Sequence, residues 1–140
     1  MKFVFLSDVF YNEYADCKEI EIKRARPYVM VRIKIGGTDF AVPMRSSINH
    51  KYVFWTDKEN GCGLDFSKTV VIRKAEYVDT SKSPFIRPNE YDALRGQEHL
   101  IKQRLLQYIN TYKKARKRLD VERNRRICEY STLQYFETYI

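Results

Sequence analysis

The sequence has no long apolar run and few cysteines, and each shortage excludes a class of protein. The apolar run at the N-terminus, Lys2–Leu6, is too short for a signal peptide, and no stretch approaches the length of a membrane span. Cys17, Cys62 and Cys128 are odd in number and far apart, so they support neither a disulfide framework nor a zinc site. We therefore expect a cytoplasmic protein with no membrane partner.

The sequence also lacks the motifs that hold metals and nucleotides. It contains no P-loop glycines, no HExxH, no EF-hand loop and no GxSxG elbow. Its acidic residues are scattered: Asp39 lies at an expected hairpin, and Asp57 and Glu59 lie in an expected turn. No carboxylate cluster for magnesium is recognisable, so we expect neither a metal nor a cofactor.

The residues that are present fit one basic domain. A chain of 140 residues is typical of a single domain, here 1–140, and a hydrophobic content of 44% argues against disorder. The 26 Lys and Arg residues exceed the 18 Asp and Glu residues, which leaves a net charge of +8. Such a charge favours polyanionic partners, nucleic acid before a membrane surface. The simpler alternative is a soluble basic protein with no such partner.

The hydrophobic pattern of the first half predicts strands. Apolar or alternating runs predict strands at residues 2–6, 28–35, 39–42, 52–55, 69–72 and 75–78, with 69–72 in the centre of the sheet. Gly36 and Gly37 predict the turn of a hairpin between the second and third of these. One further strand is predicted at 127–130.

Helices are predicted mainly in the second half. Ser7 predicts the cap of a short helix near the N-terminus. A long helix is predicted from Asn89, where Asn89 and Asp92 resemble a capping start. Its apolar face comprises Leu94, Ile101, Leu105, Tyr108, Tyr112 and Ala115. Ser131 with Gln134 fits the capping box of a terminal helix.

The stretch 40–51 joins a short apolar run to a cluster of polar side chains. The cluster supplies two cations, two hydroxyls, an amide and an imidazole: Arg45, Ser46, Ser47, Asn49, His50 and Lys51. Cutting RNA without a metal requires removal of the 2′-hydroxyl proton, neutralisation of the phosphate and protonation of the 5′-oxygen. His50 suits the proton transfers, because an imidazole titrates near pH ~6.5. Arg45 or Lys51 suits the phosphoryl oxygens, to which the serines would donate hydrogen bonds. The alternative is a structural histidine.

The predicted long helix ends in a basic cluster, and a second basic cluster follows shortly after it. They comprise Lys113, Lys114, Arg116, Lys117 and Arg118, and then Arg123, Arg125 and Arg126. Cations suit a helix C-terminus, which is the simpler interpretation. Two clusters this close together exceed what the dipole requires, so we expect a surface that contacts RNA phosphates. A non-catalytic RNA-binding module would use this face alone. DNA binding is not expected, because no helix-turn-helix is recognisable.

Several motifs occur in an order that resembles one protein family. They are Leu6-Ser-Asp-x-Phe, Arg26-Pro-Tyr28, Val42-Pro-Met-Arg-Ser-Ser-Ile-Asn-His-Lys51, Gly63-Leu-Asp-Phe-Ser-Lys-x-Val-Val-Ile72, Tyr108-Ile-x-x-Tyr112 and Tyr130-Ser-Thr-Leu-Gln-Tyr-Phe136. This order, spread over nearly the whole chain, is similar to the toxin component of type III toxin-antitoxin systems, the ToxN/AbiQ group and particularly its TenpN/CptN-like branches.

The resemblance implies an α+β fold with a strongly twisted antiparallel sheet flanked by helices, distantly similar to the MazF and Kid toxins. It implies an endoribonuclease that cuts RNA without a metal and leaves a 2′,3′-cyclic phosphate and a 5′-hydroxyl. It also implies a small repeated RNA antitoxin, which the toxin cuts from its precursor and with which it forms a closed ring of protein and RNA. The related role is growth arrest and abortive infection in defence against phage.

The resemblance also implies site residues. It identifies the serine pair and the lysine after it as an active-site loop, and it leaves open which basic group of 40–51 acts as acid, base or phosphate clamp. Ser67 and Lys68 match a second motif that is expected to contact RNA near the cut. Tyr28 is expected as an aromatic of the site, with a core tyrosine as the alternative.

Overall fold

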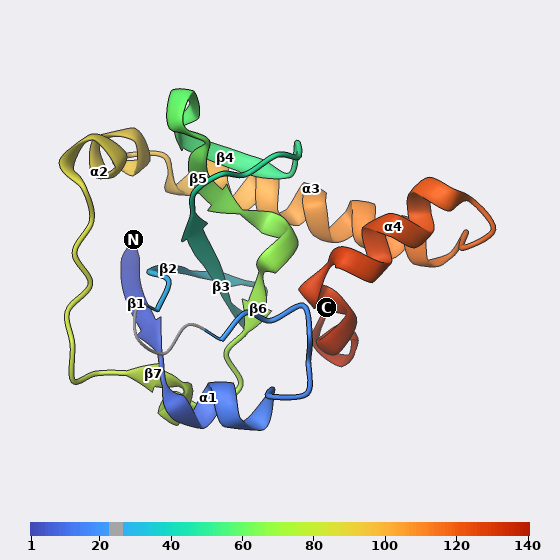
Figure 1. Ribbon diagram of the computed structural model, residues 1–140, viewed down its shortest axis with the longest axis horizontal. Helices are drawn as coiled ribbons and strands as arrows, with labels where there is room; N and C mark the ends of the chain where they lie inside the picture. Colours follow the sequence, from blue (N-terminus) through green and yellow to red (C-terminus); the bar gives the residue numbers. More distant parts are fainter. Residues whose placement is uncertain (23–26) are drawn as a thin grey trace.

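An antiparallel sheet of seven strands forms the centre of the fold, in a computed structural model that describes residues 1–22 and 27–140 (Figure 1). The strands are β1 (Lys2–Leu6), β2 (Met30–Ile35), β3 (Thr38–Arg45), β4 (Val53–Asp57), β5 (Cys62–Asp65), β6 (Val70–Val71) and β7 (Val78–Asp79). Their order is β4-β5-β3-β2-β1-β7, and β6 also pairs with β3. With helices around this sheet, the expected α+β class is confirmed.

The β2–β3 hairpin forms where the sequence predicts it. Gly36 and Gly37 have φ angles of 54° and 84°, in the left-handed region that tight hairpin turns use and that glycine adopts without a steric penalty. β2 buries Val31 and leaves Lys34 exposed, which agrees with a strand that has one face toward solvent. β3 continues to Arg45, beyond its predicted end at residue 42. Arg45 therefore lies on a strand and not in the predicted loop.

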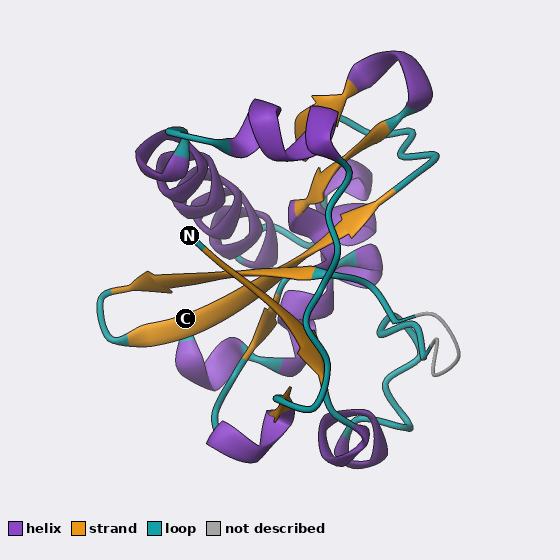
Figure 2. Cartoon of the chain, turned by 90° about the vertical axis from the view of Figure 1, so that its left-hand side faces the viewer, coloured by secondary structure: helices purple, strands orange, loops and turns teal. Residues whose placement is uncertain are grey.

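β3 has two successive partners along one edge. Phe40 pairs with Val71 of β6, whereas Met44 pairs with Leu64 of β5. The strands cross steeply in Figure 2, so the sheet is strongly twisted. Two expectations were wrong here. The run 69–72, predicted in the centre of the sheet, contributes a two-residue strand with one partner. Residues 62–65, for which no strand was predicted, form a fully buried strand.

Gly63 explains how β5 fits beside β4. A Cβ at this position would lie 2.5 Å from the carbonyl oxygen of Phe54 and 2.8 Å from the Cγ2 of Val53. Only glycine permits this close approach of two strands. Gly63 is therefore a packing requirement inside the sheet.

Four α-helices accompany the sheet in the described residues: α1 (Asp8–Glu13), α2 (Pro88–Leu94), α3 (Glu98–Arg116) and α4 (Glu122–Tyr130). Ser7 caps α1 as predicted, since its hydroxyl oxygen accepts a backbone hydrogen bond. The long helix predicted from Asn89 is two helices separated at Gly96, which has a φ of 77°. α2 begins at Pro88 without a side-chain cap, so the predicted capping start of Asn89 with Asp92 was wrong.

The apolar face predicted for the long helix is confirmed. Its members are buried: Leu94 on α2, and Ile101, Leu105, Tyr108, Tyr112 and Ala115 on α3. They share one core with sheet residues such as Val31, Val42 and Leu64. α3 runs behind β4 and β5, and its C-terminal end extends past the sheet to meet α4 (Figure 1).

The C-terminal segment forms short helices. Residues 127–130, predicted as a strand, are the last turn of α4. Ser131 caps the 3-10 helix η4 (Thr132–Tyr135), and η5 (Glu137–Tyr139) follows. The Gln134 side chain donates to the Ser131 carbonyl oxygen, so the predicted capping box forms only on its serine side. Similarly, most of the strand predicted at 75–78 is the 3-10 helix η3 (Ala75–Tyr77).

Two further observations concern membrane-spanning helices and cysteines. Over the described ranges, no helix combines the length and apolar character needed to cross a membrane. Cys17, Cys62 and Cys128 are all free thiols. Burial raises the pKa of each thiol, which keeps it protonated and weakly nucleophilic near neutral pH.

Candidate functional site

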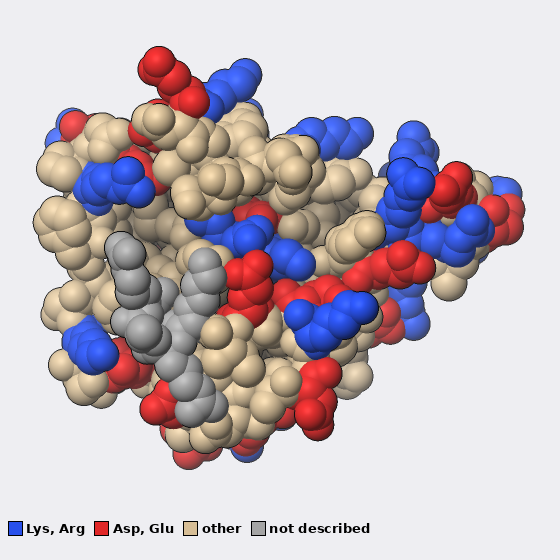
Figure 3. Space-filling view, viewed as in Figure 1, with Lys and Arg blue, Asp and Glu red and all other residues tan. Residues whose placement is uncertain are grey.

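A cleft of about 560 Å³ opens beside the end of β3, between the turn after β5 and helix α4. Seven of the predicted site residues line it: Arg45, Asn49, His50, Ser67, Lys68, Arg123 and Arg126. In Figure 3, basic side chains gather near the middle of one face and along the α3–α4 arm, which we define as residues 113–126. The fold thus joins three segments that are far apart in the sequence.

Asp65, the last residue of β5, lies beneath the cleft with a side chain that is 0% exposed. Its Oδ2 accepts a hydrogen bond from Arg45 Nη1 at 2.6 Å, and its Oδ1 accepts from the Ser67 hydroxyl at 2.6 Å and the Ser67 amide at 3.0 Å. The amide bond makes Asp65 the N-cap of the 3-10 helix η2 (Phe66–Lys68). Burial raises the pKa of Asp65, but the hydrogen bonds that it accepts outweigh burial and hold the pKa below its usual range. Asp65 is therefore ionised, and it holds Arg45 and the start of η2 in place.

His50 lies in the loop after β3 and uses both ring nitrogens within the protein. Its Nδ1 accepts a hydrogen bond from the Tyr52 amide at 3.0 Å, so the neutral ring carries its hydrogen on Nε2. Nε2 lies 3.1 Å from Asp65 Oδ1 and 3.3 Å from Ser67 Oγ. The ring donates toward Asp65 and ties the loop to η2. Because both ring nitrogens make contacts within the protein, this geometry favours a positioning role for His50.

Arg45 lies at the end of β3, opposite Gly63 of β5. Its Nη1 contacts Asp65, its Nη2 lies 3.1 Å from Glu21 Oε1, and its guanidinium carbon lies 5.6 Å from the centre of the Tyr28 ring. Burial lowers the pKa of Arg45, but hydrogen bonds with Tyr28 and Asp65 outweigh it and raise the pKa. The cation is fixed in place at the cleft wall.

Tyr28 supports Arg45 from outside the cleft. Its hydroxyl donates to Glu21 Oε2 at 2.6 Å, and its ring lines two neighbouring hollows but not the cleft itself. The predicted aromatic of the site thus contacts a site residue without facing the cleft. Arg26, from the same predicted motif, lies outside the described residues.

Lys68 ends η2 and points its amine into the cleft region, where Nζ donates to the Tyr130 carbonyl oxygen at 3.1 Å. Burial lowers the pKa of Lys68; Asp65 opposes this effect, Arg45 reinforces it, and the resulting pKa lies below its usual range. An amine with a lowered pKa gives up its proton more readily near neutral pH, as a general base must. The sequence marked Lys68 only for RNA binding.

The C-terminal segment holds η2 in place from behind. The Thr132 hydroxyl donates to the carbonyl oxygens of Ser67 and Thr69, and the Tyr108 hydroxyl donates to Ser131 Oγ at 2.7 Å. Each of these groups is buried. Because buried hydrogen-bonded groups are costly to displace, the position of Ser67 and Lys68 depends on the start of η4.

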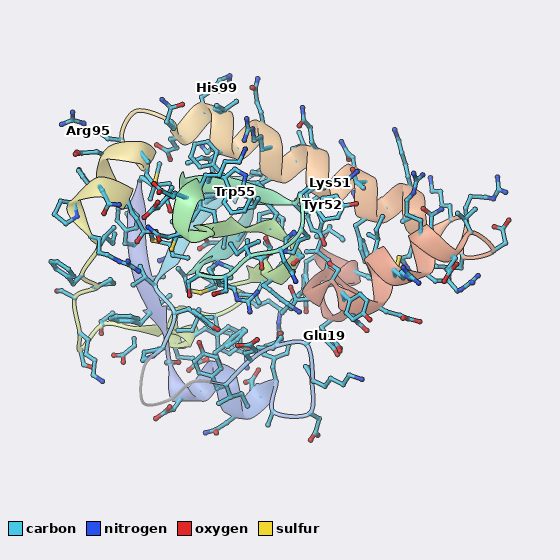
Figure 4. The ribbon with its side chains drawn as sticks, turned by 45° about the horizontal axis from the view of Figure 1, so that its top comes forward. Glu19, Lys51, Tyr52, Trp55, Arg95 and His99 are labelled. Atoms are coloured by element: carbon cyan, nitrogen blue, oxygen red, sulfur yellow. The ribbon has the colours of Figure 1, made fainter. Side chains whose placement is uncertain are left out.

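Three predicted catalytic residues do not line the cleft. Ser46 faces a neighbouring groove, and Ser47 is exposed with a φ of 56°, a strained left-handed conformation. The Lys51 amine lies 5.6 Å from the centre of the Tyr52 ring, on the side toward α3 (Figure 4). The loop turns because Ile48 is buried and its amide donates to the Gly61 carbonyl oxygen at 3.0 Å.

The α3–α4 arm contributes only part of its predicted basic surface to the cleft, through Arg123 and Arg126. Other members serve the fold locally: Arg116 pairs with Glu137, Arg118 pairs with Asp120, and Arg125 donates to the Leu119 and Asp120 carbonyl oxygens. The remaining members, Lys113, Lys114 and Lys117, do not line the cleft. Several of these cations therefore have partners within the protein.

Sequence reasoning missed Asp65 and the aromatic wall of the cleft. Asp65 looked like one of many scattered acids, although Leu64 and Phe66 on either side are buried. An acid inside an apolar run is a signal of a buried charge that needs partners. Tyr52 and Tyr130 also line the cleft, but the abundance of tyrosine gave no means of singling them out.

Two further comparisons concern the site: its ability to hold a metal ion and its similarity to known proteins. Among the residues that the structure describes, no group of three or more His, Cys, Asp or Glu side chains is placed to hold a metal ion. No protein-family model, curated protein or solved structure compared with this chain matches it.

Proposed function

We propose that this protein is a metal-independent endoribonuclease. The observation that carries the proposal is the Lys68 amine, whose pKa is lowered by burial, beside the fixed Arg45 cation in a cleft with basic walls. An amine with a lowered pKa suits proton removal, and a guanidinium suits the charge that develops on a phosphate. Arg123 and Arg126 give the cleft affinity for a polyanion.

The proposed reaction is a transesterification at one RNA phosphate. Lys68 in its neutral form takes the proton of the 2′-hydroxyl, and the 2′-oxygen attacks the adjacent phosphorus. Arg45 neutralises the phosphoryl oxygens while the bond from phosphorus to the 5′-oxygen breaks. The 5′-oxygen takes a proton from a solvent water molecule at the open side of the cleft, and Lys68 returns the proton that it took to the resulting hydroxide. The products are a 2′,3′-cyclic phosphate and a 5′-hydroxyl.

Asp65 and His50 act in this proposal by positioning. Asp65 fixes the guanidinium of Arg45 and the start of η2, which carries Lys68. His50 ties the loop after β3 to the same carboxylate. Because a displacement of about 1 Å can cost a hundredfold in rate, this buried network is expected to matter for cleavage without touching the RNA.

The biological setting of the proposal is a type III toxin-antitoxin system. Its support is the order of motifs along the chain, which resembles the ToxN/AbiQ group, together with the basic cleft. In this setting the protein cuts cellular or phage transcripts, and a repeated RNA antitoxin that the protein itself processes inhibits it in a closed protein–RNA assembly. Growth arrest in infected cells would protect the bacterial population.

A cleavage assay in EDTA tests the proposed activity. Purified protein is incubated with RNA, and the product ends are mapped; we expect cyclic phosphates and 5′-hydroxyls from the unmodified protein and intact RNA from Lys68→Ala. The matched control is Lys114→Ala, a cation of the α3–α4 arm outside the cleft. Cleavage by Lys68→Ala at the unmodified rate would contradict the assignment of the base.

The same assay distinguishes the alternative, a non-catalytic RNA-binding module. The exposed cations of the α3–α4 arm favour this alternative, because they give a basic surface that does not depend on the cleft (Figure 3). Salt-sensitive binding without any cut product would support it and overturn the ribonuclease.

A further inference from the structure

A second groove lies on the other side of Arg45 from the cleft. Its volume is about 310 Å³, and its walls are the end of β3, the segment before β2 and the loop before α2. Arg45 lines both hollows, so its guanidinium stands between them. A chain that passes the cleft and continues beyond Arg45 would enter this groove.

Phe85 lines the groove, and packing in the protein core does not account for an aromatic residue at this position. Its side chain is 79% exposed, the highest value among the large hydrophobic residues in the described part of the chain. It lies in the loop between β7 and α2, which runs along the edge of the molecule (Figure 1). An exposed aromatic in a groove that two arginines also line presents a flat apolar face, on which a nucleobase stacks favourably.

Arg87 places a fixed cation at the same groove. Its Nε lies 3.3 Å from Glu90 Oε2, and Glu90 is buried and accepts a hydrogen bond from the Thr56 hydroxyl at 2.6 Å. The buried carboxylate therefore holds the guanidinium, most of which remains exposed. Arg45 also lines the groove, so its lining includes two cations and the Phe85 ring, together with the Glu90 carboxylate that pairs with Arg87.

We propose that this groove is a subsite for an unpaired nucleotide that flanks the one held in the cleft, with its base stacked on Phe85 and its phosphate near Arg87. A positively charged groove with an aromatic platform is the usual arrangement for single-stranded nucleic acid. The subsite rests on the proposed ribonuclease function, and it restricts the substrate to single-stranded RNA because a base inside a duplex has no free face to stack.

Intrinsic fluorescence tests the stacking contact directly. The reporter is Phe85→Trp in the full chain with Trp55→Phe, which removes the native tryptophan. The ligand is single-stranded 2′-O-methyl RNA roughly 12 nucleotides long, which 2′-attack cannot cut. Base stacking should quench the reporter on RNA addition, whereas inorganic polyphosphate, which has charge without bases, should not.

Affinity measurements complete the test. Phe85→Ala should weaken RNA binding at least about fivefold, and Phe85→Tyr should restore it. The control is Tyr139→Ala, a partly exposed aromatic on η5 that lines neither hollow. Unchanged affinity of Phe85→Ala, or equal quenching by polyphosphate, would overturn the subsite while RNA binding and cleavage by the unmodified protein still support the proposed function. Failure of the unmodified protein to bind RNA would overturn both.

Discussion

The Asp65 cluster and the α3–α4 arm are both rich in cations, but they hold them differently. In the cluster, Arg45 and His50 contact a carboxylate that is 0% exposed. In the arm, Arg118 and Arg126 pair with Asp120 and Glu122, and all four of these side chains are 66–68% exposed. Exposed pairs are screened by water and salt and contribute little, whereas buried charges interact strongly and hold one geometry.

The two regions are therefore suited to different tasks: the Asp65 cluster holds side chains in fixed positions, and the α3–α4 arm attracts a charged partner. A buried carboxylate with several donors fixes its partners, so the cluster is suited to place reacting groups. The exposed arm can attract a polyanion from any direction without fixing it. Variants of the two regions should therefore fail in different ways, the cluster in rate or stability and the arm in affinity.

The largest effect is expected from Lys68→Ala. It should lower the single-turnover cleavage rate by about 10²- to 10⁴-fold, the usual contribution of a general base, with RNA affinity nearly unchanged. The unmodified rate should rise with pH and level off below the ordinary lysine pKa of 10.5, because burial lowers the pKa of Lys68 and the neutral amine is the active form. Lys68→Arg should not restore cleavage, since a guanidinium stays protonated. A rate that falls as pH rises toward 9 would exclude Lys68 as the base.

Asp65→Asn should lower the free energy of unfolding by about 3–5 kcal/mol, because removal of one partner from a buried charged network leaves the others uncompensated. Urea denaturation of the two proteins at neutral pH measures the difference. Asp120→Asn, in the arm, removes an exposed partner and should change stability far less than Asp65→Asn does. Equal effects of the two substitutions would remove the distinction between the regions.

The stabilising effect of Asp65 should depend on pH. Its folded pKa is lower than the ordinary value of 3.8, so the charged form stabilises the fold above pH 3.8 and this contribution is lost as pH falls through the folded pKa. The stability difference between the unmodified protein and Asp65→Asn should be constant from pH 5 to 7 and should shrink in more acidic solution. A difference that grows on acidification would contradict the sign of the pKa shift.

The sequence predicts local structure well where the residues of the segment itself determine its conformation. Gly36 and Gly37 are enough for the hairpin turn, and the apolar spacing from Leu94 to Ala115 is enough for a buried helical face. Prediction fails where the structure of a segment depends on contacts with residues far away in the sequence. The strand at 62–65 exists because Gly63 fits against β4 and Leu64 pairs with Met44, and neither contact can be read from the strand itself.

The candidate site shows the same limit. The loop 45–51 and Ser67-Lys68 were both identified from residue types, and His50 does meet Ser67 at 3.3 Å. The roles within them could not be assigned, because they depend on which way the loop turns after β3. The buried Ile48 sets that turn, and it carries Lys51 to the side of α3 while Lys68 lines the cleft.

Arg123 and Arg126 should affect affinity more than rate. Changing both to Ala should weaken RNA binding and reduce the slope of log K against log salt by about 0.7 for each phosphate that the variant no longer neutralises. Single-turnover cleavage at saturating protein should stay close to that of the unmodified protein. Arg118→Ala is the control, because this residue pairs with Asp120 and does not line the cleft. A slope unchanged in the double variant would place the RNA path elsewhere.

Lys51→Ala should have the smallest effect, although the sequence makes Lys51 a leading catalytic candidate. Its amine contacts the Tyr52 ring at 5.6 Å on an exposed surface, an interaction of about 0.5–1 kcal/mol, and it does not line the cleft. Cleavage should therefore stay within about fivefold of the unmodified rate, since the whole of such an interaction accounts for no more than that. His50→Ala makes the useful comparison, because it removes the link between the same loop and Asp65 and should slow cleavage clearly. A hundredfold loss in Lys51→Ala with an unaffected His50→Ala would show that the amine of the loop, and not the buried cluster, carries the chemistry.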